Sequence, residues 1–316
     1  MELQPVEAEQ RPGLIQTVFL NERGLRAGWR LLIFVSILFV VARVINLIIT
    51  LVLRPGNTPP PRPSSISPFS VLPGEVAGIA LVLFASWIMS RIEHRDLGEY
   101  GLPIKNSGLL SQFVVGYLFW GFLPLAVLLL IMRALHVFYF GNLALHNSQV
   151  LYWGLLWWVV FLCVGIFEEY LFRGYLLYTL SDGIGFWPGA IILAVLFAVG
   201  HAMNPGETRI GVLMTAVFTI FAAMTLWRTG NLWLAVGAHA GWDWSESYFF
   251  GTNDSGLPAQ GHLLNSHVQG PTWLSGGSVG PEGSILALFL MLVMTIAAYF
   301  LLHKRSRKPA LMITPR

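Results

Sequence analysis

The sequence predicts an all-α, polytopic membrane protein, a bundle of about eight transmembrane helices. Hydrophobic residues make up 55% of the 316 residues and charged residues only 11%, whereas a soluble domain carries about 25% charged residues. Several apolar runs reach the ~20 residues that cross a hydrocarbon core as a helix. The net charge of +3 and the lack of a basic patch exclude nucleic acid as an expected partner. The lipid bilayer is the expected environment.

Eight apolar runs predict the spans, in chain order: 31–53, 71–89, 113–133, 150–180, 187–202, 208–227, 231–250 and 284–303. The fourth run is too long for a perpendicular span, so its C-terminal part is expected to tilt or to leave the bilayer. The single cysteine, Cys163, lies in this run, which excludes an internal disulfide.

Lysine and arginine residues indicate the orientation of the bundle in the cell membrane. They concentrate before the first span, after the second span and in the C-terminal tail, and residues 251–283 contain none. With eight spans, both termini are therefore predicted to be cytoplasmic. The exceptions are few: Arg54, Arg62, Arg133 and Arg209 fall at external positions. The N-terminus shows no short apolar core followed by a cleavage site, so we expect no signal peptide.

The spans divide the chain into five parts. Residues 1–30 form a cytoplasmic N-terminal segment, and 31–147 hold three accessory spans with a Pro-rich external loop. Residues 148–250 form a core of four helices. A Gly- and Ser-rich external loop, expected to be mobile, follows at 251–283. The last span and a basic cytoplasmic tail occupy 284–316.

Three charged residues lie inside the apolar fourth run: Glu168, Glu169 and Arg173. Each charge at bilayer depth costs about 2.5–3.5 kcal/mol on insertion scales. Charged residues kept at that cost usually belong to a functional site, so they indicate one here. Glu169 and Arg173 are four residues apart and share a helix face, so they are expected to pair. Glu168 is turned away by about 100° and is left free for another partner. A purely structural ion cluster would explain the pair but not Glu168.

Two later runs bring further ionisable groups to membrane depth. His201 ends a run with no other polar side chain; taken alone, it could equally be a packed, hydrogen-bonded residue. His239 and Asp243 are four apart on one face, which is expected to look into the bundle. The structural alternative is a single hydrogen bond between His239 and Asp243 that fixes the histidine tautomer. Small residues around them allow another helix to approach closely: Gly237, Ala238, Ala240 and Gly241.

Brought together, Glu168, His201, His239 and Asp243 would form one polar site. A carboxylate with imidazoles can hold a water molecule and take its proton, directly or on a metal. No Ser or Cys has a His in a recognisable nucleophile motif, so activated water is preferred over an acyl-enzyme. One difficulty is depth. Counted at 1.5 Å per residue, Glu168 lies ~27 Å from the external end of its span and His201 ~20 Å from the start of its own. They meet only if a helix begins later, tilts or is displaced.

At these residues the chain resembles the CPBP family (CAAX protease and bacteriocin-processing family) of multi-pass membrane endopeptidases. The family has three motifs: two glutamates, three residues and an arginine; a phenylalanine, three residues and a histidine; and a histidine, three residues and an asparagine or related residue. The matching residues here are Glu168, Glu169, Arg173, Phe197, His201, His239 and Asp243. The resemblance covers about residues 150–250.

The resemblance implies a helical membrane protease whose cavity opens to the cytosolic side. It implies that Glu168 and His201 prepare the water, and that His239 and Asp243 stabilise the oxyanion or hold an ion. The supporting residues that it implies are Glu169, Arg173 and Phe197.

Asp243 departs from the asparagine that is common at this position of the family. A neutral amide donates to an oxyanion, whereas an ionised aspartate repels it. Asp243 would therefore be protonated, orient His239 or bind a cation. This favours a metalloprotease with zinc, and the expected ligands are Glu168, His201, His239 and Asp243.

The sequence thus predicts a membrane-embedded endopeptidase that cleaves a protein or peptide substrate. A prenylated C-terminal tail, a leader peptide and a membrane-bound regulator remain open as substrates. The alternatives are a proton- or ion-coupled transporter, which also uses buried acids and histidines, and a catalytically silent scaffold or immunity protein of the same fold. Two other charges at depth, Arg43 and Glu75, are expected to form a structural ion pair.

Overall fold

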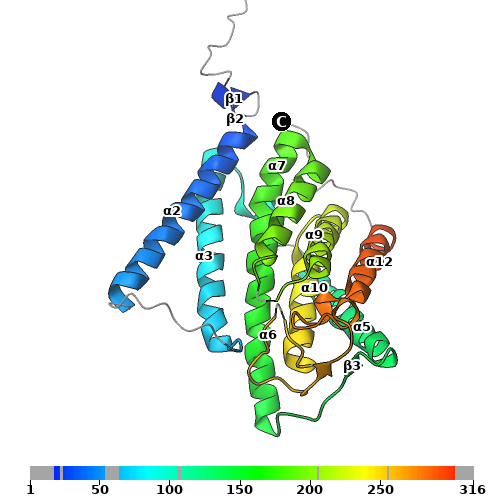
Figure 1. Ribbon diagram of the computed structural model, residues 1–316. Coiled ribbons are helices and arrows are strands. Elements are labelled where there is room, and N and C mark those ends of the chain that lie inside the picture. Colours follow the sequence, from blue (N-terminus) through cyan, green and yellow to red (C-terminus); the bar gives the residue numbers. More distant parts are fainter. Residues whose placement is uncertain are drawn as a thin grey trace, which may run out of the picture.

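The computed structural model describes residues 18–21, 24–53, 64–105, 108–204, 206–254 and 256–302. It is a bundle of helices, which confirms the predicted all-α membrane fold (Figure 1). The small amount of strand forms two antiparallel pairs: β1 (Leu20–Asn21) with β2 (Gly24–Leu25), and β3 (Phe138–Tyr139) with β4 (His267–Val268). Parts of three predicted segments lie outside the described residues: the N-terminal segment, the Pro-rich loop and the basic tail.

The chain passes through the bundle in alternating directions (Figure 1). The first segments are α2 (Ala27–Leu53), α3 (Pro68–Glu93) and a continuous run of α4 (Leu109–Val115), η2 (Gly116–Phe122) and α5 (Leu123–Ala134). The central segments are α6 (Ser148–Glu169), continued by η3 (Tyr170–Leu176) and α7 (Leu177–Ile184), then α8 (Phe186–His201) and α9 (Arg209–Thr229). The last are α10 (Trp233–Asp243), continued by η4 (Trp244–Phe249), and α12 (Ile285–Leu301). Short helical turns are η1 (Leu97–Tyr100), α11 (Thr272–Ser275) and η5 (Pro281–Gly283).

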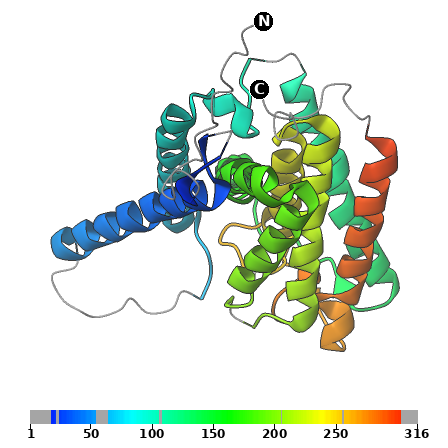
Figure 2. The ribbon, with the colours of Figure 1, turned by 90° about the horizontal axis from the view of Figure 1, so that it is seen from above.

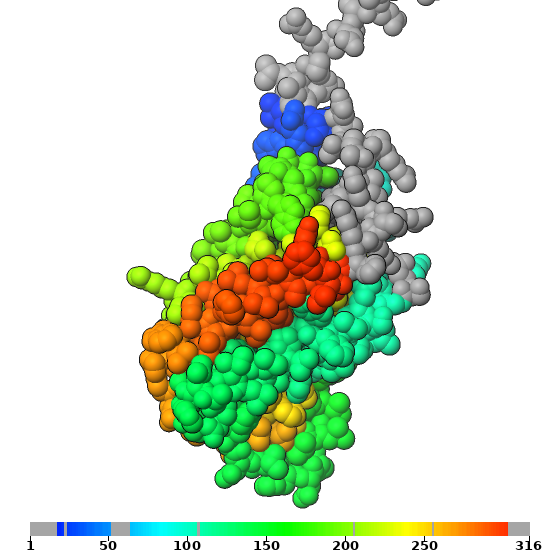
Figure 3. All heavy atoms as spheres, turned by 90° about the vertical axis from the view of Figure 1, so that its right-hand side faces the viewer, coloured from blue at the N-terminus to red at the C-terminus, as the bar shows by residue number. Residues whose placement is uncertain are grey.

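All eight predicted spans are helical, but they differ in length. Within the described residues, five helices are long and apolar enough to cross a membrane: Ala27–Leu51, Pro68–Glu93, Leu109–Ala134, Ser148–Ile184 and Arg209–Thr229. Helices α8 and α12 are apolar but shorter, and α12 packs along α9 and α5 on the outer surface (Figure 3).

A helical hairpin resolves the difference in depth between Glu168 and His201. Gly185 has φ of +94°, a conformation that favours glycine, and it separates α7 from α8. Glu168 lies 17 residues before Gly185 and His201 lies 16 residues after it. In an antiparallel hairpin, residues at equal distances from the turn lie at similar heights. The helix Ser148–Ile184 has 37 residues, so its first turns extend past the level at which α8 ends. The distance of Glu168 from Ser148 therefore does not give its height relative to His201.

Helix α10 lies at the centre of the bundle, and Leu234 to Asp243 are all buried. The small residues predicted to allow close helix approach do so. A Cβ atom on Gly237 would lie 2.2 Å from the carbonyl oxygen of Phe113, and one on Gly241 would lie 2.2 Å from that of Tyr117. Only glycine fits these positions without moving the backbone of α4 and η2, so this contact fixes the position of α10.

Helix α2 extends away from the bundle (Figures 1 and 2), and most of its side chains are exposed. It is anchored near its start, where Arg30 contacts Glu93 at 2.9 Å and Asp182 at 2.8 Å. Further along, α2 diverges from α3. The predicted pair of Arg43 and Glu75 is therefore wrong: exposed Arg43 lies over the ring of Phe39, and Glu75 faces a cavity.

The loop predicted to be mobile is folded against the bundle in its described part. The backbone N–H of Leu263 donates to Tyr248 (2.7 Å), and that of Gln260 donates to Ile66 (2.9 Å). The indole of Trp157 donates to the carbonyl of Gln260 at 2.8 Å. The loop thus closes one end of the bundle and supplies residues to the site.

Candidate active site

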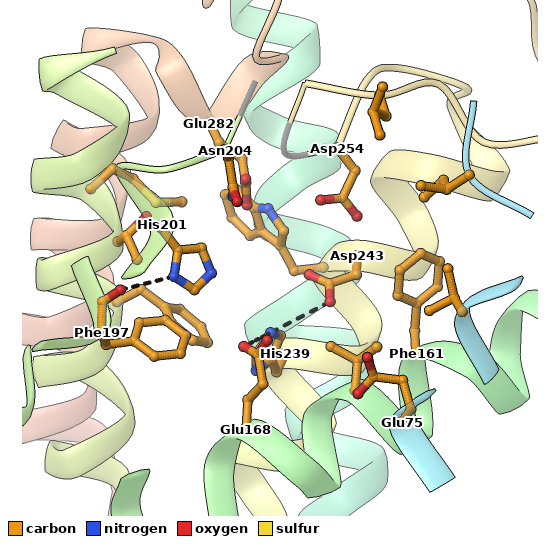
Figure 4. A pocket seen from close by; sticks show the side chains of 18 residues that line it. Glu75, Phe161, Glu168, Phe197, His201, Asn204, His239, Asp243, Asp254 and Glu282 are labelled. Atoms are coloured by element: carbon orange, nitrogen blue, oxygen red, sulfur yellow. Dashed lines mark hydrogen bonds and ion pairs between the residues drawn. The ribbon is translucent and has the colours of Figure 1, made fainter. Parts of the chain in front are cut away.

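A cavity of about 330 Å³ lies among α3, α6, α8, α9, α10 and the folded loop (Figure 4). Its lining includes all four residues that the sequence predicted to converge: Glu168, His201, His239 and Asp243. They come from three helical segments, which close packing and the hairpin at Gly185 bring to one level.

Glu169 and Arg173 form the predicted ion pair, and both side chains are fully buried. Arg173 Nε donates to Glu169 Oε2 at 2.8 Å, and Arg173 Nη2 contacts Glu169 Oε1. The guanidinium carbon also lies 4.9 Å from the ring centroid of Phe197 and 5.8 Å from that of Phe218. A bidentate pair with aromatic contacts offsets part of the cost of burying two charges.

His239 is held by this ion pair. Its Nδ1 lies 2.9 Å from Glu169 Oε1, and because the carboxylate accepts, Nδ1 carries the proton and donates. Its Nε2 is left on the cavity side, 3.4 Å from Asp243 Oδ2 and 3.7 Å from Glu168 Oε2. Glu169 therefore sets the tautomer of His239. The structural alternative in the sequence analysis had given this role to Asp243. Asp243 instead contacts the opposite nitrogen, Nε2, of the same ring.

His201 lies at the end of α8, on the opposite side of the cavity from Glu168 and His239 (Figure 4). Its Nδ1 lies 2.9 Å from the carbonyl oxygen of Phe197. A carbonyl only accepts, so Nδ1 donates and Nε2 is an acceptor facing the cavity. No hydrogen bond or ion pair joins His201 to Glu168 among the described residues. The two groups can cooperate only through a molecule bound between them.

Phe197 links the two walls of the site. Its ring centroid lies 4.8 Å from that of Phe172 and 4.3 Å from that of His201, and the same ring contacts the guanidinium of Arg173. Its position fits the supporting role that the family resemblance implied.

Two π-helical segments adjoin the site. Segment η3 begins directly after Glu169, and η4 begins directly after Asp243. Within η3, Gly174 has a non-helical backbone with φ of −84° and ψ of −114°. Single π-helical turns are rare and frequently occur at functional sites.

Sequence reasoning missed several polar residues that line the cavity: Glu75, Asn204, Asp254 and Glu282. Burial, together with the nearby carboxyl of Asp254, raises the pKa of Glu282 to about 8. Asp254 and Glu282 belong to the loop, whose composition gave no sign of tertiary contacts. The carboxylate at position 75 was a usable signal, but it was assigned to a pair with Arg43.

The described residues contain no group of three or more His, Cys, Asp or Glu side chains that could hold a metal ion. Glu168, His239 and Asp243 lie on one side, and His201 lies across the cavity (Figure 4). The four expected ligands therefore do not fit a single ion in this arrangement, and no catalytic step is assigned to a metal. Zinc stays a prediction.

The cavity lies on the side of the bundle where α3 begins and the loop folds back, whereas α2 begins at the other end (Figure 1). Its lining includes Ile66, which precedes α3, and Leu257 of the loop. If both termini are cytoplasmic, the loop residues that line the cavity lie on the external side of the membrane.

Residues 150–245 match the family model described as type II CAAX prenyl endopeptidase Rce1-like. The matched segment contains every residue of the three sequence motifs, from Glu168 to Asp243, so the predicted resemblance is confirmed there. It covers less than half of the 316-residue chain, and α2, α3, α5 and α12 lie outside it. Comparison with curated proteins and with solved structures returned no match.

Proposed function

We propose that this chain, which carries an Rce1-like endopeptidase segment at residues 150–245, cleaves a peptide bond of a protein or peptide substrate within the membrane. One observation carries the proposal: Glu168, His201, His239 and Asp243 all line a single cavity. The enclosed volume admits a water molecule and a short stretch of extended peptide. A family of proteases implies such a substrate.

Glu168 is the general base of the proposed reaction. Its side chain is 25% exposed and faces the cavity. Among the described residues it has no arginine partner, because Arg173 pairs with Glu169. The carboxylate takes a proton from water, and the water oxygen attacks the carbonyl carbon of the scissile bond. The C–N bond then breaks as the protonated Glu168 returns the proton to the leaving nitrogen.

The two histidines hold the reacting groups from opposite sides. His201 Nε2 accepts a hydrogen bond from the attacking water. When protonated at Nε2, His239 donates to the oxygen that becomes negative. Asp243, 3.4 Å from that nitrogen, keeps the ring in place. Glu169 and Arg173 act behind His239 by fixing its other nitrogen.

The proposal is tested with the full-length chain, purified in detergent and incubated with a peptide library. We expect the wild type to cleave some peptides and His201→Gln to cleave the same peptides about 10²- to 10⁴-fold more slowly, the usual contribution of a positioned acid–base group. Metal analysis of both proteins tests the zinc prediction separately. Equal cleavage by the two proteins, or no cleavage by the wild type, would contradict the proposed chemistry.

We also propose that both termini are cytoplasmic, on the strength of the lysine and arginine distribution, so that the cavity faces the external half of the membrane. In a background with Cys163→Ser, we expect Gln269→Cys of the external loop to react with an impermeant maleimide in intact cells. Asp96→Cys, which follows α3 at the other end of the bundle, should react only after permeabilisation. The opposite pattern would show that the cavity faces the cytosol.

A further inference from the structure

The wall of the cavity formed by α3 lies outside the segment that matches the protease family. Its position is fixed by packing on α6: a Cβ atom on Gly78 would lie 2.9 Å from the ring of Phe167. One turn earlier on this helix, Glu75 lines the cavity. Its Oε2 atom is buried and has no hydrogen-bond partner among the described residues. A carboxylate oxygen buried at bilayer depth without a hydrogen-bond partner among the described residues is available to a bound molecule.

The cavity as a whole favours a positive charge. Among the described residues, its lining contains five carboxyl groups and two histidines but no lysine or arginine. Three of these carboxyl groups have other roles, since Glu168 and Asp243 flank His239 and Asp254 accepts a hydrogen bond from Ser247 at 2.8 Å. Glu282 lies in the loop, in η5, and not on the wall formed by α3. Glu75 is the carboxyl group that α3 brings to the cavity.

The geometry of the cavity also suits a contact near the scissile bond. Glu168 lies between His201 on one side and Glu75 on the other (Figure 4). An extended peptide that passes the proposed base would place a neighbouring side chain beside α3. A carboxylate on that wall would attract a cationic side chain and repel an anionic one.

We propose that Glu75 is a specificity-determining residue that binds a lysine or arginine side chain next to the scissile bond of the substrate. This inference rests on the proposed endopeptidase function. It gives a role to the accessory helix α3, and it predicts that the preferred substrate is a basic segment rather than one with a carboxyl group beside the cleaved bond.

The test uses the full-length protein in detergent and a peptide that the wild type cleaves, made in three versions with Lys, Gln or Glu at the position flanking the cleaved bond. For the wild type, we expect kcat/KM for the Lys peptide to exceed that for the Glu peptide at least about tenfold. Glu75→Gln should remove this preference, measured within that variant as the ratio of kcat/KM for the Lys peptide to kcat/KM for the Glu peptide. Glu75→Lys should reverse the preference, a result that a purely structural role or misfolding would not produce.

Asp96→Asn, an exposed carboxylate at the far end of the bundle, serves as the control and should keep the wild-type preference. If the wild type cleaves peptides but Glu75→Gln and Glu75→Lys keep its charge preference, the inference about Glu75 is wrong and the endopeptidase proposal stands. If the wild type cleaves none of the peptides, both fail together.

Discussion

Replacing Glu168 by glutamine is expected to reduce peptide cleavage about 10²- to 10⁴-fold, the range lost when a positioned general base is removed. The amide has nearly the shape of the carboxylate but cannot take a proton from water. Because Glu168 lines the cavity and its side chain is 25% exposed, the bundle should keep its thermal stability. The measurement is kcat/KM on a cleaved peptide, together with the unfolding temperature in the same detergent.

A matched control is Glu99→Gln. Glu99 is a partly exposed carboxylate that pairs with Arg95 at the other end of the bundle, and this variant should cleave at the wild-type rate. If Glu168→Gln kept full activity, the water-activation mechanism would be wrong. If neither the wild type nor any variant cleaved a peptide, and Glu168→Gln abolished transport of a proton or ion that the wild type carries, the transporter function would replace the protease function as the proposal.

Arg173→Met is expected to cause the largest loss of stability, about 3–5 kcal/mol in the free energy of unfolding. It leaves the carboxylate of Glu169 buried without its guanidinium partner, and both side chains have no exposed surface. Methionine keeps most of the side-chain volume, so lost charge compensation accounts for most of the effect. Thermal unfolding of the purified protein in detergent measures it.

Arg95→Met provides the comparison, because Arg95 also pairs with a glutamate four residues away but is 37% exposed. Pairs of that kind contribute about 0–1 kcal/mol. The double variant Glu169→Gln with Arg173→Met should be more stable than Arg173→Met alone, since no buried charge is left unpaired. It should still cleave slowly, because His239 loses the carboxylate that holds Nδ1. Equal stability of Arg173→Met and the wild type would contradict this account of the ion pair.

The sequence by itself indicated the membrane bundle, the Glu169–Arg173 pair and the four ionisable residues that line the cavity. These follow from local rules: apolar runs of sufficient length span a bilayer, residues four apart share a helix face, and charges at depth are too costly to keep without a partner. The glycines beside His239 likewise predicted a close helix contact, because only the absence of a side chain allows one backbone to approach another so closely.

Only the tertiary structure decided how the groups are paired. The depth of Glu168 relative to His201 depends on the turn at Gly185, and counting from the distant ends of the helices left that depth unresolved. The partner of His239 Nδ1 is Glu169, which lies 70 residues earlier in the chain, and no helix periodicity relates the two. Glu75 and the loop residues Asp254 and Glu282 face the site because α2 diverges from α3 and the loop folds back on the bundle. Such contacts depend on the packing of segments far apart in sequence, which spacing along one helix does not encode.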